Sequence, residues 1–249
     1  MKINYKQHED RTGLPLVKAG IHILEIGRSL SESDLLTLSS FNGAVDWKRV
    51  SSEAGLQGSE IIFAMDDLDS SDVDLTLRKS DTGRAWHNVD VEVLTPAFCS
   101  PLSSSIHTVL APAFAPGFVG TDWDDIKAAL RRGDKGFLAL VQGEPEGAMR
   151  KANDLIAARL SGIGVDGSVK AVLASLFLSE SGFDLTLYRQ AAGLLKGMYS
   201  GEQSALISVP IISDESPMVA LLIVYDAPTQ SHISRSSRPP MGGGTAGKQ

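Results

Sequence analysis

The chain has 249 residues, a formal net charge of −7 and a hydrophobic content of 43%. This length accommodates one large domain or two small ones, each able to bury its own core. The acidic balance argues against a general nucleic-acid binder and against a protein that binds anionic membranes, because both partners are negatively charged. The single cysteine, Cys99, excludes an internal disulfide and favours a reducing compartment.

Both ends of the chain are polar. The N-terminal stretch MKINYKQHEDRTG is too polar for a signal peptide, and no apolar run approaches the roughly 18 residues of a membrane span. We therefore expect a cytoplasmic protein. Residues 1–16 are expected to form a loose arm, and residues 228–249, rich in Ser, Gly and Pro, a disordered tail.

The N-terminal half of the chain contains short elements of both kinds. Ser29 and Glu32 have the Ser-x-x-Glu spacing of a capping box, which predicts a helix from there to about Phe41. Residues 45–54 are expected to form another short helix, and residues 96–120, rich in Pro, Ser and Ala, a connection without a long helix. Apolar runs and alternating apolar residues predict strands at 21–26, 61–65, 73–77 and 89–93.

The pattern of residues 116–227 is more regular. Buried strands are predicted at 136–142, 169–178, 205–212 and 218–225, and helices at 122–132, 146–160 and 185–199. Thr121 or Asp122 is expected to cap the first helix, and the third is expected to bury a face that includes Leu185 and Leu195. Three helices on one face of a four-stranded sheet form a two-layer α/β sandwich.

This half resembles the C-terminal domain of FtsZ, the bacterial tubulin homologue, in the order of its elements and in several short stretches. The matching stretches are GTDWDDIKAAL (120–130), GFLALVQGEPEG (136–147), FDLTLYRQAAGLLKGMYSGE (183–202) and SDESPMVALLIVYDA (213–227). The resemblance implies an α/β protein of two domains. Residues 17–115 are then a reduced Rossmann-like region similar to the nucleotide domain, and residues 116–227 the FtsZ C-terminal-like sandwich.

The nucleotide-binding motifs of that family are degenerate here. Residues 59–67 (SEIIFAMDD) resemble the apolar strand that leads into the glycine-rich phosphate loop, and residues 89–98 resemble a later strand. A phosphate loop needs successive glycines, because only a backbone without Cβ brings several N–H groups onto the anion. Here the place is taken by Asp66, Asp67 and Asp69, whose carboxylates would repel a triphosphate. We therefore expect no nucleotide cofactor.

Two acids match a catalytic feature of the family. In FtsZ, the loop before the first sandwich helix carries an Asn and two Asp residues, and it reaches the nucleotide of the next subunit in a filament. Asp122 and Asp125 match the two acids, whereas Gly120 stands at the Asn position. The acids either form a half-site that acts on a neighbour's nucleotide or only cap a helix and complement its dipole.

No metal site is expected. The acidic run that contains Asp66, Asp67 and Asp69 is a weak candidate for a hard cation such as Mg²⁺ or Ca²⁺. It departs from the calcium-loop pattern, because Arg78 stands where the bidentate Glu belongs, so a solvated turn is the simpler interpretation. The histidines show no i, i+4 pairing.

These observations predict a degenerate FtsZ/tubulin-like protein without autonomous GTPase activity. Its expected role is protein–protein interaction, by self-assembly or by binding an FtsZ-like filament through the sandwich. The alternative is a divergent GTP-binding protein or GTPase that holds GTP with other residues. A third interpretation is a small-molecule-binding or enzymatic protein that shares the sandwich by architecture alone.

Overall fold

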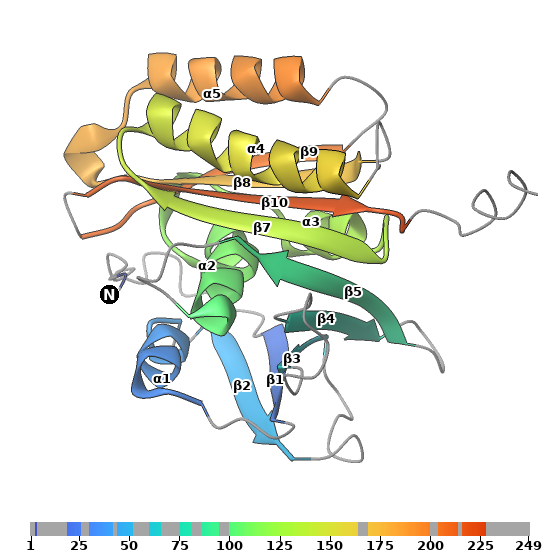
Figure 1. The fold of residues 1–249 in the computed structure, drawn as a ribbon. Coiled ribbons are helices and arrows are strands. Elements are labelled where there is room, and N and C mark those ends of the chain that lie inside the picture. Colours follow the sequence, from blue (N-terminus) through green and yellow to red (C-terminus); the bar gives the residue numbers. More distant parts are fainter. Residues whose placement is uncertain are drawn as a thin grey trace, which may run out of the picture.

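The computed structural model describes residues 3, 19–25, 30–41, 44–51, 60–65, 75–80, 86–94, 100–163, 169–199, 204–213 and 216–227. Its strands are β1 (Ala19–Glu25), β2 (Val45–Val50), β3 (Ile61–Met65), β4 (Leu75–Ser80), β5 (Trp86–Val93), β6 (Gly117–Val119), β7 (Lys135–Gln142), β8 (Val169–Phe177), β9 (Ser204–Pro210) and β10 (Met218–Tyr225). Its helices are α1 (Glu32–Ser39), α2 (Pro101–Phe114), α3 (Trp123–Leu130), α4 (Pro145–Gly162) and α5 (Leu185–Met198). The described part of the chain is thus an α/β fold, as predicted (Figure 1).

The strands form one mixed sheet in the order β2-β1-β3-β4-β5-β7-β10-β8-β9-β6. The two halves of the chain meet where β5 and β7 pair in parallel, from Asp90 opposite Lys135 to Val93 opposite Leu138. The predicted domain boundary between residues 115 and 116 therefore divides a continuous sheet. The boundary itself stays a prediction. Of residues 1–16 only Ile3 is described, and it is buried in the core. The expected tail at 228–249 lies outside the described residues.

The strands predicted at 21–26 and 61–65 are confirmed as β1 and β3, and the alternating stretches correspond to β4 and β5. The predicted helix at 45–54 is wrong. These residues begin with the strand β2, which pairs in parallel with β1 and buries Val45 and Val50 at its two ends. The helix α1 is confirmed, but its capping box is formed by Ser31 and Asp34 and not by Ser29 and Glu32.

The expectation that residues 96–120 contain no long helix is also wrong. They contain α2, which begins after the cap Ser100, and whose residues from Leu102 to Pro112 are buried. Pro101 at the first helical position needs no N–H partner, so it starts the helix and does not break it. Pro112 lies in the last turn, where it removes only one bond of the helical ladder.

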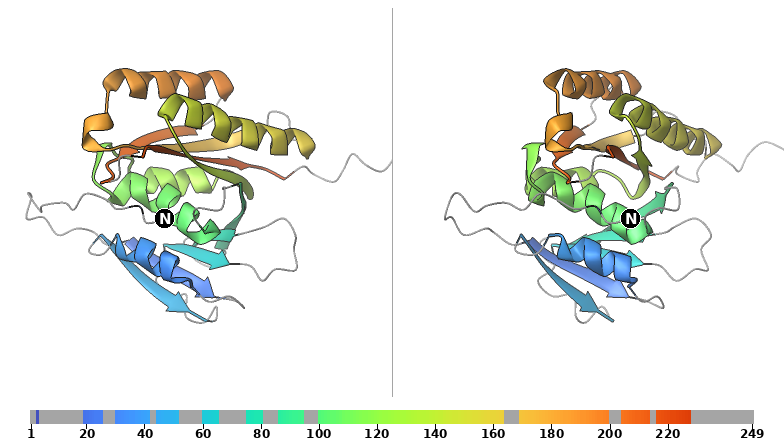
Figure 2. Two further views of the ribbon diagram at one scale, coloured as in Figure 1. Left: turned by 60° about the vertical axis from the view of Figure 1, so that its left-hand side comes forward. Right: turned by 90° about the vertical axis from the view of Figure 1, so that its left-hand side faces the viewer.

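Helices cover both faces of the C-terminal strands (Figures 1 and 2). The helices α4 and α5 pack on one face, whereas α2 and α3 pack on the other, so the prediction of three helices on one face is wrong. The connections β7–α4–β8 and β8–α5–β9 join parallel strands in the same direction across the sheet, and the right-handed rule places both helices on one side. That rule does not apply to α3, because it joins the antiparallel strands β6 and β7.

The burial of both faces explains the composition of the strands. Every residue of β10 is buried, and its side chains alternate between the two cores. Ala220 and Leu222 face α2 and the N-terminal strands, whereas Val219 and Leu221 face α4 and α5. A strand with two buried faces reads as a continuous apolar run, as the sequence does here. Among the described helices, none has the length and apolarity that a membrane crossing requires.

A buried carboxylate joins α1 to α2. Asp34, only 4% exposed, accepts hydrogen bonds from the Ser31 N–H (3.0 Å) and hydroxyl (2.6 Å), and from the hydroxyls of Ser103 (2.8 Å) and Ser100. It therefore lies at the N-termini of two helices, where the helix dipoles favour an anion. Burial by itself raises the pKa of Asp34, but the hydrogen bonds from Ser100, Ser31 and Ser103 outweigh it, and the pKa lies below its ordinary value.

We expect Asp34→Asn to lower the free energy of unfolding by about 2 kcal/mol at neutral pH, because an amide cannot accept all these bonds. A depressed folded-state pKa contributes stability above the unfolded pKa of about 4, and this stability is lost as the pH falls through the folded value. The difference between wild type and Asp34→Asn should therefore be constant from about pH 5 to pH 8 and shrink below about pH 4. Urea unfolding across this range measures it, with Glu32→Gln, an exposed acid of the same helix turn, as the control. A difference that grows on acidification would contradict the assignment.

Candidate functional site

The two acids that match the FtsZ loop lie at the start of α3, in different environments. Asp122 is the N-cap, and its carboxylate accepts the backbone N–H of Asp124 at 2.8 Å. Asp125 is exposed in the first turn, and within the described residues no hydrogen bond or ion pair involves its side chain. The cap accounts for Asp122 without chemistry, whereas the carboxylate of Asp125 is available to a partner. A catalytic role for either acid stays a prediction.

The start of α3 is anchored to the N-terminal half of the chain. The Trp123 indole N–H donates to the carboxylate of Glu60, immediately before β3, and its ring packs against Phe114 of α2 with centroids 5.0 Å apart. Lys127 reaches Asp124 at 2.5 Å and Glu60 at 3.7 Å. The start of α3, which carries Asp122 and Asp125, is thus held by a partly buried aromatic ring together with the Asp122 cap and the Asp124–Lys127 ion pair.

The weak metal-site candidates Asp66, Asp67 and Asp69 lie outside the described residues. The single cysteine, Cys99, lies outside them too. In the part of the chain that is described, no three His, Cys, Asp or Glu side chains are grouped so that they could hold a metal ion.

An apolar surface lies at the edge strand β6, which precedes α3 in the chain. Phe118 of the edge strand β6 is 40% exposed, and its ring stacks on that of Phe183 with centroids 4.1 Å and planes 13° apart. Leu185, the first residue of α5, is 50% exposed. We call Phe118, Phe183 and Leu185 the β6 edge patch. Leu195 is buried on the inner face of α5 as predicted, but Leu185 is not.

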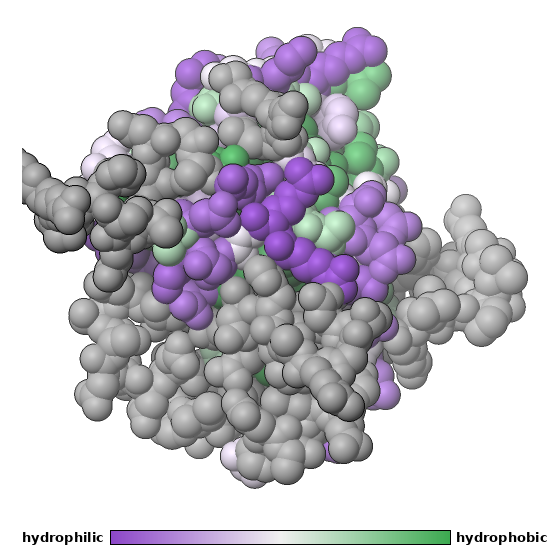
Figure 3. Space-filling model, turned by 90° about the vertical axis from the view of Figure 1, so that its right-hand side faces the viewer, coloured by the Kyte–Doolittle hydropathy of each residue, from purple (hydrophilic) through white to green (hydrophobic). Residues whose placement is uncertain are grey.

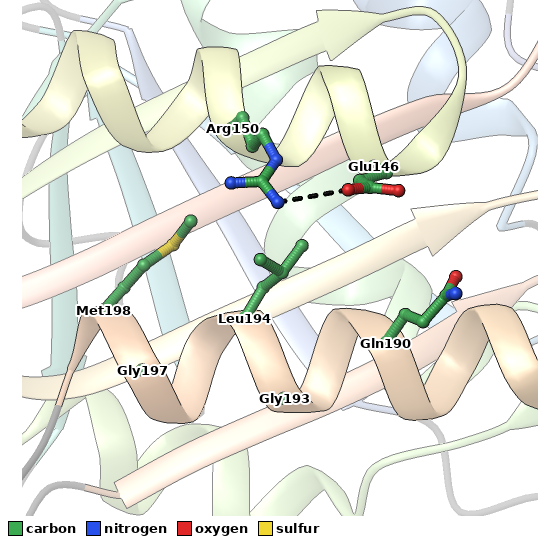
Figure 4. A pocket seen from close by; sticks show the side chains of 7 residues that line it. All are labelled: Glu146, Arg150, Gln190, Gly193, Leu194, Gly197 and Met198. Carbon is green, nitrogen blue, oxygen red and sulfur yellow. Dashed lines mark hydrogen bonds and ion pairs between the residues drawn. The ribbon is translucent and has the colours of Figure 1, made fainter.

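A groove lies between α4 and α5 on the outer face of the molecule (Figure 4). It is open to solvent, with a volume of about 480 Å³, and is lined by Glu146, Arg150, Gln190, Gly193, Leu194, Gly197 and Met198. The Arg150 guanidinium donates to Glu146 at 3.1 Å along one wall. Sequence analysis did not indicate this groove, because the spacing of residues within one helix does not show which helix lies beside it.

Charged side chains gather at the ends of β7, β8 and β10 that lie on the right in Figure 1, and hydrophilic residues form the centre of the described part of this face (Figure 3). Ion pairs join Asp90 to Lys135 (2.7 Å), Glu92 to Arg159 (2.5 Å) and Lys170 to Asp226 (3.2 Å). All are partly exposed, so each contributes at most about 1 kcal/mol. Exposed ion pairs of this kind are typical of an ordinary solvated surface.

Comparison with known proteins identifies no family: no family model matches the chain, and no curated protein matches it. Among solved structures, it is similar to a point mutant of FtsZ from M. jannaschii, with 15% identity over 50% of this chain and a TM-score of 0.39. It is also similar to an empty FtsZ dimer from the same organism, with 16% identity over 49% of this chain and a TM-score of 0.38. The matches span 36% and 35% of those FtsZ chains, about a third of their length.

The cap at Asp122 makes a testable prediction. Asp122→Ala should cost about 1 kcal/mol, because the Asp124 N–H loses its acceptor, and should lower the melting temperature by about 2–4 °C. Asp122→Asn should melt close to wild type, since Asn caps about as well as Asp. The control is Asp125→Ala, which removes an exposed acid of the same turn that makes no hydrogen bond or ion pair among the described residues. If differential scanning calorimetry finds Asp122→Ala as stable as wild type, the hydrogen bond to the Asp122 side chain does not stabilise the protein.

Proposed function

We propose that this chain is a protein-interaction module that docks an FtsZ-like subunit through the β6 edge patch, and that it does not hydrolyse GTP by itself. The subunit is a further copy of this chain or part of an FtsZ-like filament. The observation that carries the proposal is the pair of stacked rings, Phe118 on Phe183, left partly in water at a sheet edge. The class of partner rests on the sequence resemblance of residues 116–227 to the FtsZ C-terminal domain.

The patch has the character of an interface core. Large aromatic side chains supply much contact area for little lost entropy, and they are enriched where binding energy concentrates. The stacking of Phe118 on Phe183 fixes the ring before a partner arrives, which lowers the cost of ordering it. Phe118 also belongs to the outermost strand, and edge strands are where a second chain adds most readily.

The acids of the α3 start follow Phe118 closely in the chain, and we assign them the role of a polar rim. Phe118 and Asp122 are four residues apart in the chain, and Asp124 and Asp125 are exposed beside them. An apolar centre with a charged rim is the usual anatomy of an interface between proteins, and the rim charges guide the approach of a partner of opposite charge. Asp125 fits this role best, because Asp122 is occupied as a cap.

The proposal predicts that Phe118→Ser weakens association by about tenfold or more, the effect of removing an interface anchor. Sedimentation velocity measures self-association of the purified chain, and interferometry measures its binding to a purified FtsZ. Leu36→Ser is the matched control, since Leu36 is 41% exposed but lies on α1, away from the patch. Thermal melting verifies that both variants are folded.

Two results would overturn the proposal. One is that the wild-type chain neither self-associates nor binds FtsZ. The other is that Phe118→Ser and Leu36→Ser associate equally well, which would place the contact elsewhere on the molecule.

A further inference from the structure

The contact between α1 and α2 is polar along much of its length. Of the three buried residues of α1, Asp34 and Thr37 are polar and Leu38 is apolar. Asp34 accepts hydrogen bonds from the hydroxyls of Ser100 and Ser103, and the Thr37 hydroxyl donates to that of Ser103 at 3.2 Å. A helix that packs permanently on a core normally buries an apolar stripe. Here the hydrogen bonds can be exchanged for bonds to water when the two helices separate.

The residues of α2 that face α1 form one stripe. Ser100, Ser103 and His107 are spaced at i, i+3 and i+7, so they lie on the same face of the helix. The ring of His107 lies against that of Phe41, two residues beyond the end of α1, with centroids 6.3 Å apart. The segment from α1 to Phe41 therefore covers a polar stripe that ends in a titratable side chain.

Little apolar surface attaches α1 to the rest of the molecule. The helix lies at the outside of the molecule (Figures 1 and 2), and Leu36 on its outer side is 41% exposed. Among its eight residues, all of them described, Leu38 is the one that belongs to the core cluster, and Phe41 follows just beyond its end. Segments with few buried apolar contacts open separately from the core of a protein and more often than it does.

We propose that α1 is a lid that opens from α2 as a unit while the sheet stays folded, and that acid favours the open form. Opening uncovers the carboxylate of Asp34, the hydroxyls of Ser100 and Ser103, and the ring of His107. This device goes beyond the docking proposed above, because no residue of the β6 edge patch takes part in it.

Two titratable groups couple the opening to pH in the same direction. Burial lowers the pKa of His107 from 6.5 to about 3, so the closed form excludes a proton that the open form binds. The stability of the closed form is therefore lost progressively as the pH falls below about 6.5. The pKa of Asp34 is also lowered, so its contribution to the closed form is present above the unfolded pKa of about 4 and is lost below it.

The other charged groups of these elements lie away from the contact. Besides Asp34 and His107, the one titratable side chain on α1 and α2 is Glu32, which is exposed in the first turn of α1. The ring of His107 also lies against Phe177, the last residue of β8. The charged residue of that strand, Lys170, is at its opposite end and pairs with Asp226.

Hydrogen exchange of the full chain tests the lid, with the fully buried strand β10 as internal reference. At pH 7.5, the hydrogen-bonded amides from Leu35 to Ser40 should share one protection factor, at least about tenfold lower than that of β10. From pH 7.5 to 6.0, both above the sequence pI of 5.2, the opening constant of α1 should rise about fourfold after correction for intrinsic rates. The rise reports the proton that His107 takes up in the open form.

Substitutions identify the groups that hold the lid. Asp34→Asn should raise the opening constant by about tenfold or more, because an amide cannot accept all the bonds of the carboxylate. Glu32→Gln, which changes an exposed acid of the same turn, is the matched control and should change it by at most about threefold. His107→Gln should abolish the rise between pH 7.5 and 6.0, and His107→Leu should do the same. Protection of β10 verifies that each variant is folded.

Four results would each overturn the proposal. The first is that α1 and β10 share one protection factor, and the second is that protection in α1 is graded from its ends, as in ordinary fraying. The third is an opening constant of α1 that does not change between pH 7.5 and 6.0. The fourth is that Asp34→Asn and Glu32→Gln open equally often. Phe118→Ser should leave the opening unchanged, so the lid and the proposed docking can fail separately.

Discussion

The burial of α2 is the constraint on which the rest of this fold depends. The helix lies between the N-terminal strands and the face of β7, β8 and β10 that is opposite α4 and α5. A single core therefore joins both halves of the chain. At its first turn, the hydroxyls of Ser100 and Ser103 donate to the buried Asp34 carboxylate. Burial lowers the pKa of His107, which lies between the rings of Phe41 and Phe177, to about 3, so the ring is neutral at physiological pH. A charged group at this position would have no water to solvate it.

Much of this architecture could be predicted from local patterns, and the errors have identifiable causes. The strands from β7 to β10 are apolar runs of strand length, and α4 and α5 repeat with helical period, so both kinds of element were readable. The helix α2 is hard to predict because proline and serine are typical of a connection, whereas here Pro101 and Ser100 start the helix. The strand β2 was taken for a helix because its pairing with β1 cannot be read from its own residues.

The same distinction between local and tertiary features applies to the candidate sites. The cap at Asp122 followed from its position before an apolar repeat, because capping is a local interaction. The stack of Phe118 on Phe183 joins residues far apart in the chain, and the open groove depends on how α4 lies beside α5. Such surfaces arise only when elements come together, so spacing alone could not indicate them. The function proposed here rests mainly on these tertiary features.

The central claim is that this chain acts by docking another protein and not by turning over nucleotide. Calorimetric titration of the full chain with GTP and Mg²⁺ tests it most directly. The account predicts no binding tighter than about 1 mM, because the sequence resemblance to FtsZ matches Asp66, Asp67 and Asp69 to positions where a phosphate loop needs glycine N–H groups. Binding in the micromolar range, with heat released at a one-to-one ratio, would contradict it and favour a divergent GTP-binding protein.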